Sequence, residues 1–515
     1  MESLGIARAI EEVLGPGKLS TAPVDLVNYS SDMYPRTQIL KLAGKVPENR
    51  PVAVIFPETP EELAAVVRLC KDERVPLVPY GAGSGVCGSA LPEHSGIMVD
   101  VKRMASVLSF SPQDGIIVAE AGMMGERLED YLNARGFTLG HFPSSINCST
   151  VGGWIACRSA GQFSSRYGKI EDLTVGLEVV TPTGEVVTFG TLGGAHPRDP
   201  MLALMLGSEG TLGFITKAAL RAEPLPTTAD YRGFAFLTME DALLTMRRIM
   251  QSSIRPTVLR LYDPFDSMLA GFHKGGSHDA DAAGTGIRES IKRISEMLLT
   301  ELNEAAVRTA LIQPQILNRM AEVLPARPLL IAGVQGDKAE VSHQWDEIKK
   351  IADSCRAEDL GPEPGYAWLK RRYGISYKQS KVFLSGAFVD TMEVATTWDN
   401  LYPLYRAVVR AVEKDVFIMA HFSHAYREGC SIYFTFAGYG ISHKSMLSTY
   451  RRVWKHGMDT VTRFGATISH HHGVGVLKRA WLDRETPGGK EFFAAAKEAM
   501  DPAGIMNPGK LYGVD

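Results

Sequence analysis

The sequence predicts an α+β fold of two or three domains, and three observations lead to this class. Its 515 residues exceed what one hydrophobic core normally holds. From residue 51, short apolar strand patterns alternate with helical patterns and glycine-rich loops, which indicates an α/β domain. From residue 226 the helical patterns are longer, which indicates a second domain of α+β type. We therefore expect four segments, at residues 1–50, 51–225, 226–460 and 461–515.

The clearest helix start lies at residues 59–62. Thr59 suits the N-cap position, Pro60 the first helical position and Glu62 the third. The apolar residues that follow recur at helical spacing and predict a buried stripe. These residues are Leu63, Val66, Val67 and Cys70. Further patterns predict strands at 116–120, 214–218 and 328–334, a hairpin around 182–184, and helices at 1–14, 124–135, 239–251 and 338–357.

Composition excludes several classes of protein. The hydrophobic fraction of 45% and the charged fraction of 22% are typical of a globular enzyme. A net charge of −3 offers no basic field for nucleic acid, and no apolar run is long enough to span a membrane. The ends of the chain carry no secretory or lipidation pattern. Six scattered cysteines without a C-x-x-C pair predict reduced thiols, so we expect a cytoplasmic protein without a disulfide scaffold or zinc site.

A glycine-rich loop follows the apolar run at residues 75–78. Its backbone amides lack flanking side chains and can donate to phosphate oxygens. Gly83 to Gly88 match the pattern G-x-G-x-x-G. A dinucleotide-binding turn with this pattern leads into a helix, but here the next predicted element is a strand at 96–100. The sequence predicts a strand–loop–strand phosphate clamp, with a plain surface turn as the alternative. The clamp residues are Pro79, Tyr80, Gly81, Ala82, Gly83, Ser84 and Gly85.

Three later segments repeat this texture of small residues. They leave room for a flat ligand, and they follow the clamp in order between residues 143 and 213. The first contains Pro143, Ser144, Ser145, Ile146, Asn147, Cys148 and Ser149, and the second contains Cys157, Arg158, Ser159 and Ala160. The third contains Gly207, Ser208, Glu209, Gly210, Thr211, Leu212 and Gly213.

The motif order G-x-G-S, S-T-x-G-G, Y-G-x-x-E-D and G-S-E-G-T-L-G resembles the FAD-binding domain of the vanillyl-alcohol oxidase and p-cresol methylhydroxylase (PCMH-type) superfamily. The resemblance implies that FAD is the cofactor and that the four segments named above line it. It also implies two α/β subdomains that bind FAD, an α+β cap domain over the flavin, and a C-terminal segment that returns to the FAD domain.

Three clusters in the second half contain reactive side chains. His470, His471 and His472 precede a glycine turn; in a helix or strand their side chains would diverge, so all three could not bind one metal ion. Tyr433 alternates with apolar neighbours on a predicted strand and faces opposite to them. Arg260 lies among apolar residues and needs an anionic partner, either Asp263 or a ligand. Three alternatives remain: ordinary packing of Tyr433, surface histidines without a function, and a metal site that uses part of the triplet.

The motifs R-L-x-D, C-x-I-Y-F-x-F and S-H-H-H-G-V-G-x-L resemble alkyl-dihydroxyacetonephosphate synthase and its bacterial relatives. This resemblance implies that Tyr433 is the acid/base residue, that the histidine triplet is needed for activity and that Arg260 supports the site. It further implies that FAD is bound noncovalently and that a small-molecule substrate is held between flavin and cap. The implied reaction replaces an acyl group by a fatty alcohol without net redox change, and the implied oligomer is a homodimer.

One departure from this family concerns the substrate. Where the family has a phosphate-binding arginine, this chain has Gln379, with Lys378 beside it, and glutamine lacks the guanidinium fork. We keep both residues as substrate-binding candidates. The alternative is a D-2-hydroxy-acid dehydrogenase of the lactate or glycolate type, but the position of its metal-binding acid is His471 here, so we predict no metal.

Two smaller possibilities complete the predictions. A flavin-free binding module is disfavoured because all the glycine loops are intact. Related oxidases attach FAD through a histidine at the position of Ser84, and some through a cysteine that matches Cys148. Packing is the favoured role for Cys148.

Overall fold

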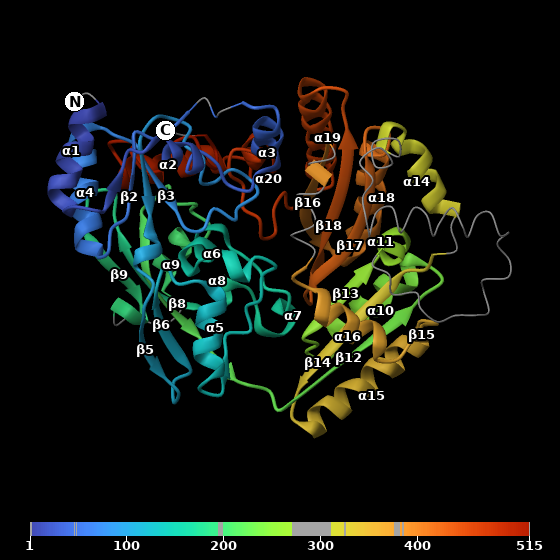
Figure 1. Cartoon of the computed structure of the whole chain (residues 1–515). Coiled ribbons are helices and arrows are strands. Elements are labelled where there is room, and N and C mark those ends of the chain that lie inside the picture. Colours follow the sequence, from blue (N-terminus) through green and yellow to red (C-terminus); the bar gives the residue numbers. More distant parts are fainter. Residues whose placement is uncertain are drawn as a thin grey trace. The chain divides into compact units, whose positions relative to one another are not determined.

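The computed structural model describes residues 3–45, 47, 49–193, 199–269, 311–323, 326–374, 382–383 and 386–513. It divides into two compact units (Figure 1). Unit 1 comprises Met1–Gly161, Tyr167–Leu225 and Ile468–Asp515; unit 2 comprises Gln162–Arg166 and Pro226–Thr467. The substrate-binding candidates Lys378 and Gln379 lie outside the described residues. Among the described helices, none is long and apolar enough to cross a membrane.

Unit 1 begins with a four-stranded sheet whose central part is parallel. The order is β1-β2-β4-β3, with β2 parallel to β4 and β4 parallel to β3. Successive residues of β2 are buried on opposite faces, because both faces of a parallel sheet are covered. The strands are β1 (Leu19–Ser20), β2 (Ala53–Ile55), β3 (Leu77–Tyr80) and β4 (Ile97–Asp100).

Helix α4 (Pro60–Glu73) confirms the predicted capping. The Thr59 hydroxyl accepts from the Glu62 amide at 3.2 Å, and the left-handed residue Arg74 ends the helix. All four residues of the predicted stripe are fully buried, and they pack with α1 (Ser3–Leu14) over one face of the sheet. This packing holds β3, and therefore the start of the first glycine loop, in the core.

A second, five-stranded antiparallel sheet completes unit 1. Its order is β5-β6-β10-β8-β9, and β8 and β9 form the predicted hairpin. The strands are β5 (Val107–Ser111), β6 (Ile116–Glu120), β8 (Thr174–Val180), β9 (Val186–Gly190) and β10 (Phe214–Arg221), and β7 (Phe137–Thr138) pairs with β11 (Glu223–Pro224). The other helices are α2 (Pro23–Asn28), α3 (Pro35–Leu42), α5 (Gly125–Asn133), α6 (Val151–Cys157), α8 (Ile170–Leu173), α9 (Pro200–Met205), α20 (Arg479–Glu485) and α21 (Gly489–Met500). Short 3-10 turns lie at Val101–Arg103, Ile146–Cys148 and Thr191–Gly193, and α7 (Ser164–Tyr167) joins the two units along the chain.

Unit 2 contains a seven-stranded antiparallel sheet in the order β15-β12-β14-β13-β17-β18-β16. The apolar residues Ile432, Phe434 and Phe436 alternate along β18 and are fully or almost fully buried, whereas Tyr433 faces the other way, as predicted. The strands are β12 (Thr228–Ala235), β13 (Val258–Tyr262), β14 (Leu329–Gly336), β15 (Glu358–Asp359), β16 (Ala387–Thr397), β17 (Phe417–Ala425) and β18 (Gly429–Tyr439).

Helices cover the apolar face of this sheet. Helix α18 contacts β16, β17 and β18, and α19 contacts β16 and β18. The sequence pattern of residues 338–357 predicted α15 to within a few residues and that of residues 239–251 predicted α10. The helices are α10 (Met239–Gln251), α11 (Pro264–Leu269), α14 (Pro314–Val323), α15 (Lys338–Ser354), α16 (Glu363–Arg371), α18 (Trp398–Val412) and α19 (His443–Arg463).

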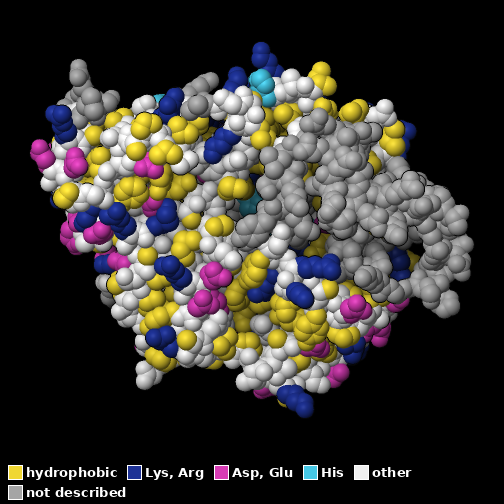
Figure 2. All heavy atoms as spheres, in the orientation of Figure 1, with side chains coloured by type: hydrophobic (Ala, Val, Ile, Leu, Met, Phe, Trp, Pro, Cys, Tyr) yellow, Lys and Arg dark blue, Asp and Glu magenta, His cyan; other side chains and the backbone are white. Residues whose placement is uncertain are grey.

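Charges are mixed over the surface. On the face drawn in Figure 2, Lys and Arg side chains and Asp and Glu side chains are both spread over the described part. This distribution agrees with the net charge of −3.

Candidate active site

The first glycine loop follows β3, and several of its backbone amides have no acceptor among the described residues. Within the described residues, the N–H groups of residues 82–85 make no hydrogen bond, and these residues are only partly buried. Lys102 lies beside the loop: its ammonium donates to the Gly81 carbonyl at 2.8 Å and to Asp100 at 2.6 Å. Unpaired amides next to a cation suit an anionic group such as a diphosphate.

The four predicted segments meet around this loop within unit 1. A Cβ on Gly81 would overlap the Thr150 hydroxyl, and a Cβ on Gly207 would lie 2.6 Å from Arg158 Cδ. Gly210 has a φ of +74°, and its Cβ would overlap the Pro79 ring. Glycine is therefore required where the loops touch. The Ser208 hydroxyl is buried and binds no described acceptor or donor, so a bound group can use it.

Several other predicted cofactor residues make contacts within unit 1 or are exposed. The Ser149 hydroxyl accepts from Trp154 Nε1 at 2.7 Å, and Arg158 is tied to Glu171 by two hydrogen bonds of 2.9 and 3.2 Å. Cys148 is exposed, with its pKa raised by partial burial of the sulfur, which does not favour the thiolate. Ser144 and Asn147 are exposed.

The Glu209 carboxylate joins the third glycine loop to the segment that follows the histidines. Oε1 accepts from the Val474 amide at 2.6 Å, and Oε2 accepts from the Gly475 amide at 2.9 Å. Burial raises the pKa of Glu209, and these two amides oppose that effect. The Asn507 amide adds a bond from the C-terminal segment to the Glu209 carbonyl at 2.6 Å. Glu209 is therefore placed to hold the histidine loop.

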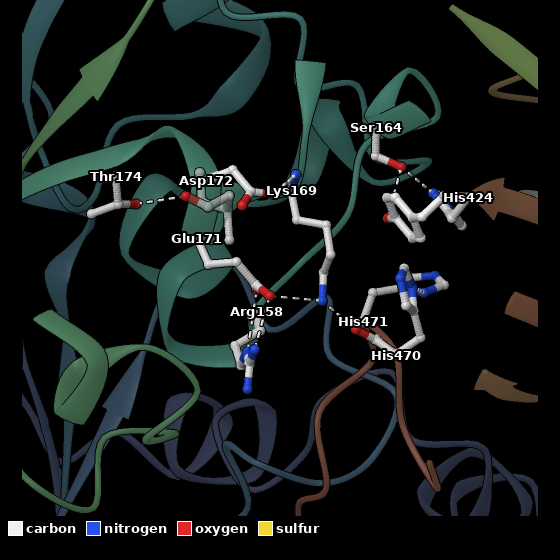
Figure 3. A network of polar contacts seen from close by, with 11 residues as sticks. Arg158, Ser164, Lys169, Glu171, Asp172, Thr174, His424, His470 and His471 are labelled. Atoms are coloured by element: carbon white, nitrogen blue, oxygen red, sulfur yellow. Dashed lines mark hydrogen bonds and ion pairs between the residues drawn. The ribbon is translucent and has the colours of Figure 1, made fainter. Parts of the chain in front are cut away.

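A second support of the histidine loop is visible in Figure 3. Lys169 donates to the His470 carbonyl at 2.7 Å and forms an ion pair of 3.3 Å with Glu171. Because residues 464–478 form no regular helix or strand, adjacent imidazoles do not diverge: the rings of His470 and His471 are 5.2 Å apart, and those of His471 and His472 are 4.5 Å apart. His470 Nδ1 and His471 Nδ1 are 3.0 Å apart, so one must donate and the other accept.

Glu209→Gln is expected to loosen the histidine loop. The amide –NH₂ would face one of two backbone N–H donors, and an unmatched buried pair costs about 1–3 kcal/mol. Hydrogen exchange of the Val474 and Gly475 amides, followed by mass spectrometry, should accelerate more than tenfold. The exposed Glu185→Gln variant is the matched control and should exchange like the unaltered protein. Unchanged exchange in Glu209→Gln would remove Glu209 from this role.

Asp32 also lies against the first glycine loop, although no motif pointed to it. Oδ1 accepts from the Tyr34 amide at 3.0 Å, Oδ2 is buried and binds no described donor, and a Cβ on Gly85 would be 3.7 Å from Oδ2. Met33 donates to the Gly83 carbonyl at 3.1 Å, which fixes this segment on the loop. Burial raises the pKa of Asp32 to about 7.

This pKa predicts a pH-dependent stability. Between about pH 4 and 7 the folded protein holds the Asp32 proton and the unfolded chain does not, so stability falls as pH rises. Above pH 7 the free energy of unfolding is lower by about 4 kcal/mol because of Asp32, since each pKa unit of difference between the folded and unfolded states corresponds to about 1.4 kcal/mol. Asp32→Asn should therefore raise the urea midpoint of the FAD-free protein more at pH 8 than at pH 5. An equal gain at both pH values would show that Asp32 is not the titrating group.

Unit 2 carries a row of polar residues on the face of its sheet opposite α18 and α19, where Asp266 of α11 also reaches the sheet. In the strand register Tyr433 lies between Glu393 of β16 and His421 of β17, and His421 pairs with Tyr262 of β13. Arg260 is two residues before Tyr262 and so shares this face. The rings of His421 and Tyr433 stack at 4.7 Å with an angle of 18°.

The environment of Tyr433 keeps its hydroxyl protonated at neutral pH. Burial, with the nearby carboxyl groups of Glu393 and Asp390, raises the pKa of Tyr433 to about 12, while Thr391 and Arg260 act in the opposite direction. A phenol in this state is a proton donor at rest, and it can act as a base only after it has given up that proton.

Arg260 does not pair with Asp263, one of the two partners that its sequence context suggested. Asp263 instead accepts from the Ala420 amide at 2.7 Å, the Tyr405 hydroxyl at 3.2 Å and the Asp266 amide at 2.8 Å. Arg260 Nη2 contacts His421 Nε2 at 2.7 Å. The reason is the strand geometry, since Asp263 lies just past the end of β13 and turns to the β17 backbone.

A second histidine of unit 2 also has a defined partner. His424 Nδ1 lies 2.8 Å from the Ser164 hydroxyl, to which the Tyr426 hydroxyl donates at 3.2 Å (Figure 3). His424 has a φ of +52° at the point where the register of β17 and β18 shifts. This pair ties the short segment 162–166 to the sheet of unit 2.

Sequence reasoning missed five residues that the structure brings to these two sites. Each is polar and surrounded by ordinary apolar or turn residues, so no local pattern distinguishes it. They are Asp32, Lys102 and Asn507 in unit 1, and Asp266 and His421 in unit 2. Only Asp266 carried a hint, because it follows the R-L-x-D motif by three residues.

Comparison with known proteins identifies the family. The family described as FAD linked oxidases, C-terminal domain, matches residues 225–511, which is more than half of the chain, and the FAD binding domain family matches residues 51–190. The chain belongs to the FAD-linked oxidase family. FAD is therefore its cofactor, and the free amides, the cation and the buried serine of unit 1 fit a flavin dinucleotide.

Two individual relatives support this assignment, and a third protein shares the fold. The alkyldihydroxyacetonephosphate synthase of Dictyostelium discoideum is 31% identical over 98% of this chain and 80% of its own length. A solved structure of an alkyldihydroxyacetonephosphate synthase has a TM-score of 0.75 at 28% identity, covering 98% of this chain and 84% of that chain. The p-cresol methylhydroxylase structure, 15% identical with a TM-score of 0.71 over 99% and 97% of the two chains, shows the shared fold. The predicted PCMH-type fold and an FAD-linked enzyme are confirmed.

Proposed function

We propose that this FAD-linked enzyme carries out ether-lipid chemistry of the alkyldihydroxyacetonephosphate synthase type. The reaction converts an acyl-dihydroxyacetone phosphate and a fatty alcohol into the alkyl ether and a free fatty acid. The bond from the substrate carbon to the acyloxy oxygen breaks, a bond to the alcohol oxygen forms, and the alcohol proton leaves with the fatty acid. No net oxidation occurs.

The observation that carries this proposal is the polar row around Tyr433. Its phenol is partly buried, protonated at neutral pH and influenced by the charge of Arg260, which is the combination that proton transfer beside a developing anion requires. Tyr433 would first donate to the departing acyloxy oxygen and then take the proton of the incoming alcohol. When bound, FAD would supply N5 as the position at which the substrate carbon reacts.

The other site residues have supporting roles in this proposal. Arg260 would stabilise the negative charge of the departing carboxylate. The histidines at 470–472, held by Glu209 and Lys169, would set the local charge near the cofactor. Lys378 and Gln379 would contact the phosphate in place of an arginine. We further propose that FAD is bound noncovalently, since Ser84 cannot form a histidyl link and Cys148 is not activated.

The test is an anaerobic visible spectrum of the yellow protein during titration. Palmitoyl-dihydroxyacetone phosphate should bleach the flavin band without an oxidised product, and hexadecanol should restore it with formation of the ether. A panel of D-2-hydroxy acids should leave the band unchanged. Bleaching by a hydroxy acid, with a keto acid formed and colour restored by an electron acceptor, would overturn the proposal in favour of a dehydrogenase.

A further inference from the structure

A buried imidazole in unit 2 lies between a carboxylate and a guanidinium. His421 is 7% exposed, and its two ring nitrogens have different partners. Nδ1 lies 3.1 Å from Asp266 Oδ2 on α11, and Nε2 lies 2.7 Å from Arg260 Nη2 on β13. The three side chains form a line in the order carboxylate, imidazole, guanidinium.

The chemistry of these partners decides the tautomer of His421. A guanidinium can only donate hydrogen bonds, so Nε2 must present its lone pair to Arg260. The ring proton therefore lies on Nδ1, where it donates to the Asp266 carboxylate. A doubly protonated ring would place two donors against each other at 2.7 Å. Burial and the charge of Arg260 lower the pKa of His421 well below its usual range, which agrees with a neutral ring.

This arrangement orients Arg260 without neutralising it. A carboxylate bound directly to the guanidinium would cancel its charge, and among the described residues no carboxylate forms an ion pair with Arg260. Asp266 acts from behind the imidazole, and Asp263 binds the β17 backbone instead. The positive charge of Arg260 thus remains effective toward Tyr433, whose pKa it lowers against the effect of burial.

The same imidazole also fixes the ring of Tyr433. The two rings are nearly parallel with centroids 4.7 Å apart, whereas Tyr262 faces His421 at 5.9 Å with a 51° tilt. The charged and titratable groups that face His421 are therefore Arg260 and Tyr262 from β13, Asp266 from α11 and Tyr433 from β18.

We infer that His421 is a positioning residue, which as the neutral Nδ1–H tautomer holds the Arg260 guanidinium uncompensated and the Tyr433 ring in place. The inference rests on the proposed function for the catalytic role of Tyr433. The hydrogen-bonding state of His421 is independent of that role and can be measured without substrate.

The first experiment is ¹⁵N NMR of the FAD-loaded protein labelled on histidine. The His421 signals, identified by their loss in His421→Phe, should show a protonated Nδ1 and an unprotonated Nε2 from pH 5.5 to 8.5. Asp266→Asn, whose side-chain oxygen can still accept from Nδ1, should retain this tautomer. An Nε2–H or doubly protonated ring in the unaltered protein would overturn the inference. If His421→Phe does not fold, the His421 signals can still be assigned, because Asp266→Asn shifts them.

The second experiment measures the effect on Tyr433 itself. An ultraviolet difference titration against Tyr433→Phe reports ionisation of that phenol. In His421→Phe an aromatic ring remains for stacking but both hydrogen bonds are lost, so Arg260 is released and the ionisation should shift upward by about one unit, a tenfold change. An unshifted ionisation would show that His421 does not act through Arg260. If the phosphate ester fails as a substrate while both results hold, the proposed function falls and the positioning role stands.

Discussion

Replacing Tyr433 by phenylalanine is expected to lower kcat by about 10²–10⁴-fold while the visible spectrum of bound FAD stays unchanged, because one proton donor is removed. The exchange removes a hydroxyl from a partly buried position on β18 and leaves the ring stacked on His421. The expected loss is therefore chemical and not structural. Turnover of palmitoyl-dihydroxyacetone phosphate with hexadecanol is the measurement.

The matched control for this variant lies on the same strand. Tyr439→Phe makes the same chemical change six residues further along β18, next to Ala387, away from the polar row. It should keep turnover within about twofold. If Tyr433→Phe keeps the activity of the control, the acid/base assignment is wrong, even where the substrate is correct.

The second large effect is expected at the contact between the first and third glycine loops. Gly210→Ala places a Cβ that overlaps Pro79 Cγ, at a φ of +74°. The left-handed conformation alone costs about 1–2 kcal/mol, and the overlap must additionally push apart two loops of the FAD cradle. We expect the affinity for FAD to fall more than tenfold, measured as the flavin-to-protein ratio after dialysis and by fluorescence titration of the FAD-free protein.

Gly136→Ala is the control that separates backbone strain at a positive φ from steric overlap of the added Cβ. Gly136 has a φ of +77° in the same unit, but a Cβ there meets no atom within 4 Å. This variant pays the conformational cost only and should bind FAD normally with a slightly lower thermal midpoint. Equal FAD affinity in the two alanine variants would contradict the claim that contact between the loops shapes the cradle.

Local patterns were sufficient to predict the elements of the fold. Thr59, Pro60 and the stripe that ends at Cys70 predicted α4, and the alternation along β18 predicted the orientation of Tyr433, because capping and periodicity depend only on near neighbours. The glycine loops, in their order, resemble those of the PCMH-type superfamily, and this resemblance was enough to predict FAD and the fold. The candidate site residues themselves remain predictions that the variants above test.

Only the tertiary structure decided the partners of the reactive groups. The sequence suggested Asp263 as a partner of Arg260. Antiparallel pairing of β13 with β17 instead places His421 beside the Arg260 guanidinium, and Asp263 faces away from it. No local pattern indicated that the Glu209 carboxylate binds amides 265 and 266 residues further along the chain. The amino-acid sequence by itself was enough to predict the strand that bears Tyr433, because alternation is local, and the family and its cofactor, because its motifs resemble those of known FAD-binding proteins. The buried polar contacts that set charge and tautomer arise from strand register between distant segments, and no local pattern records them.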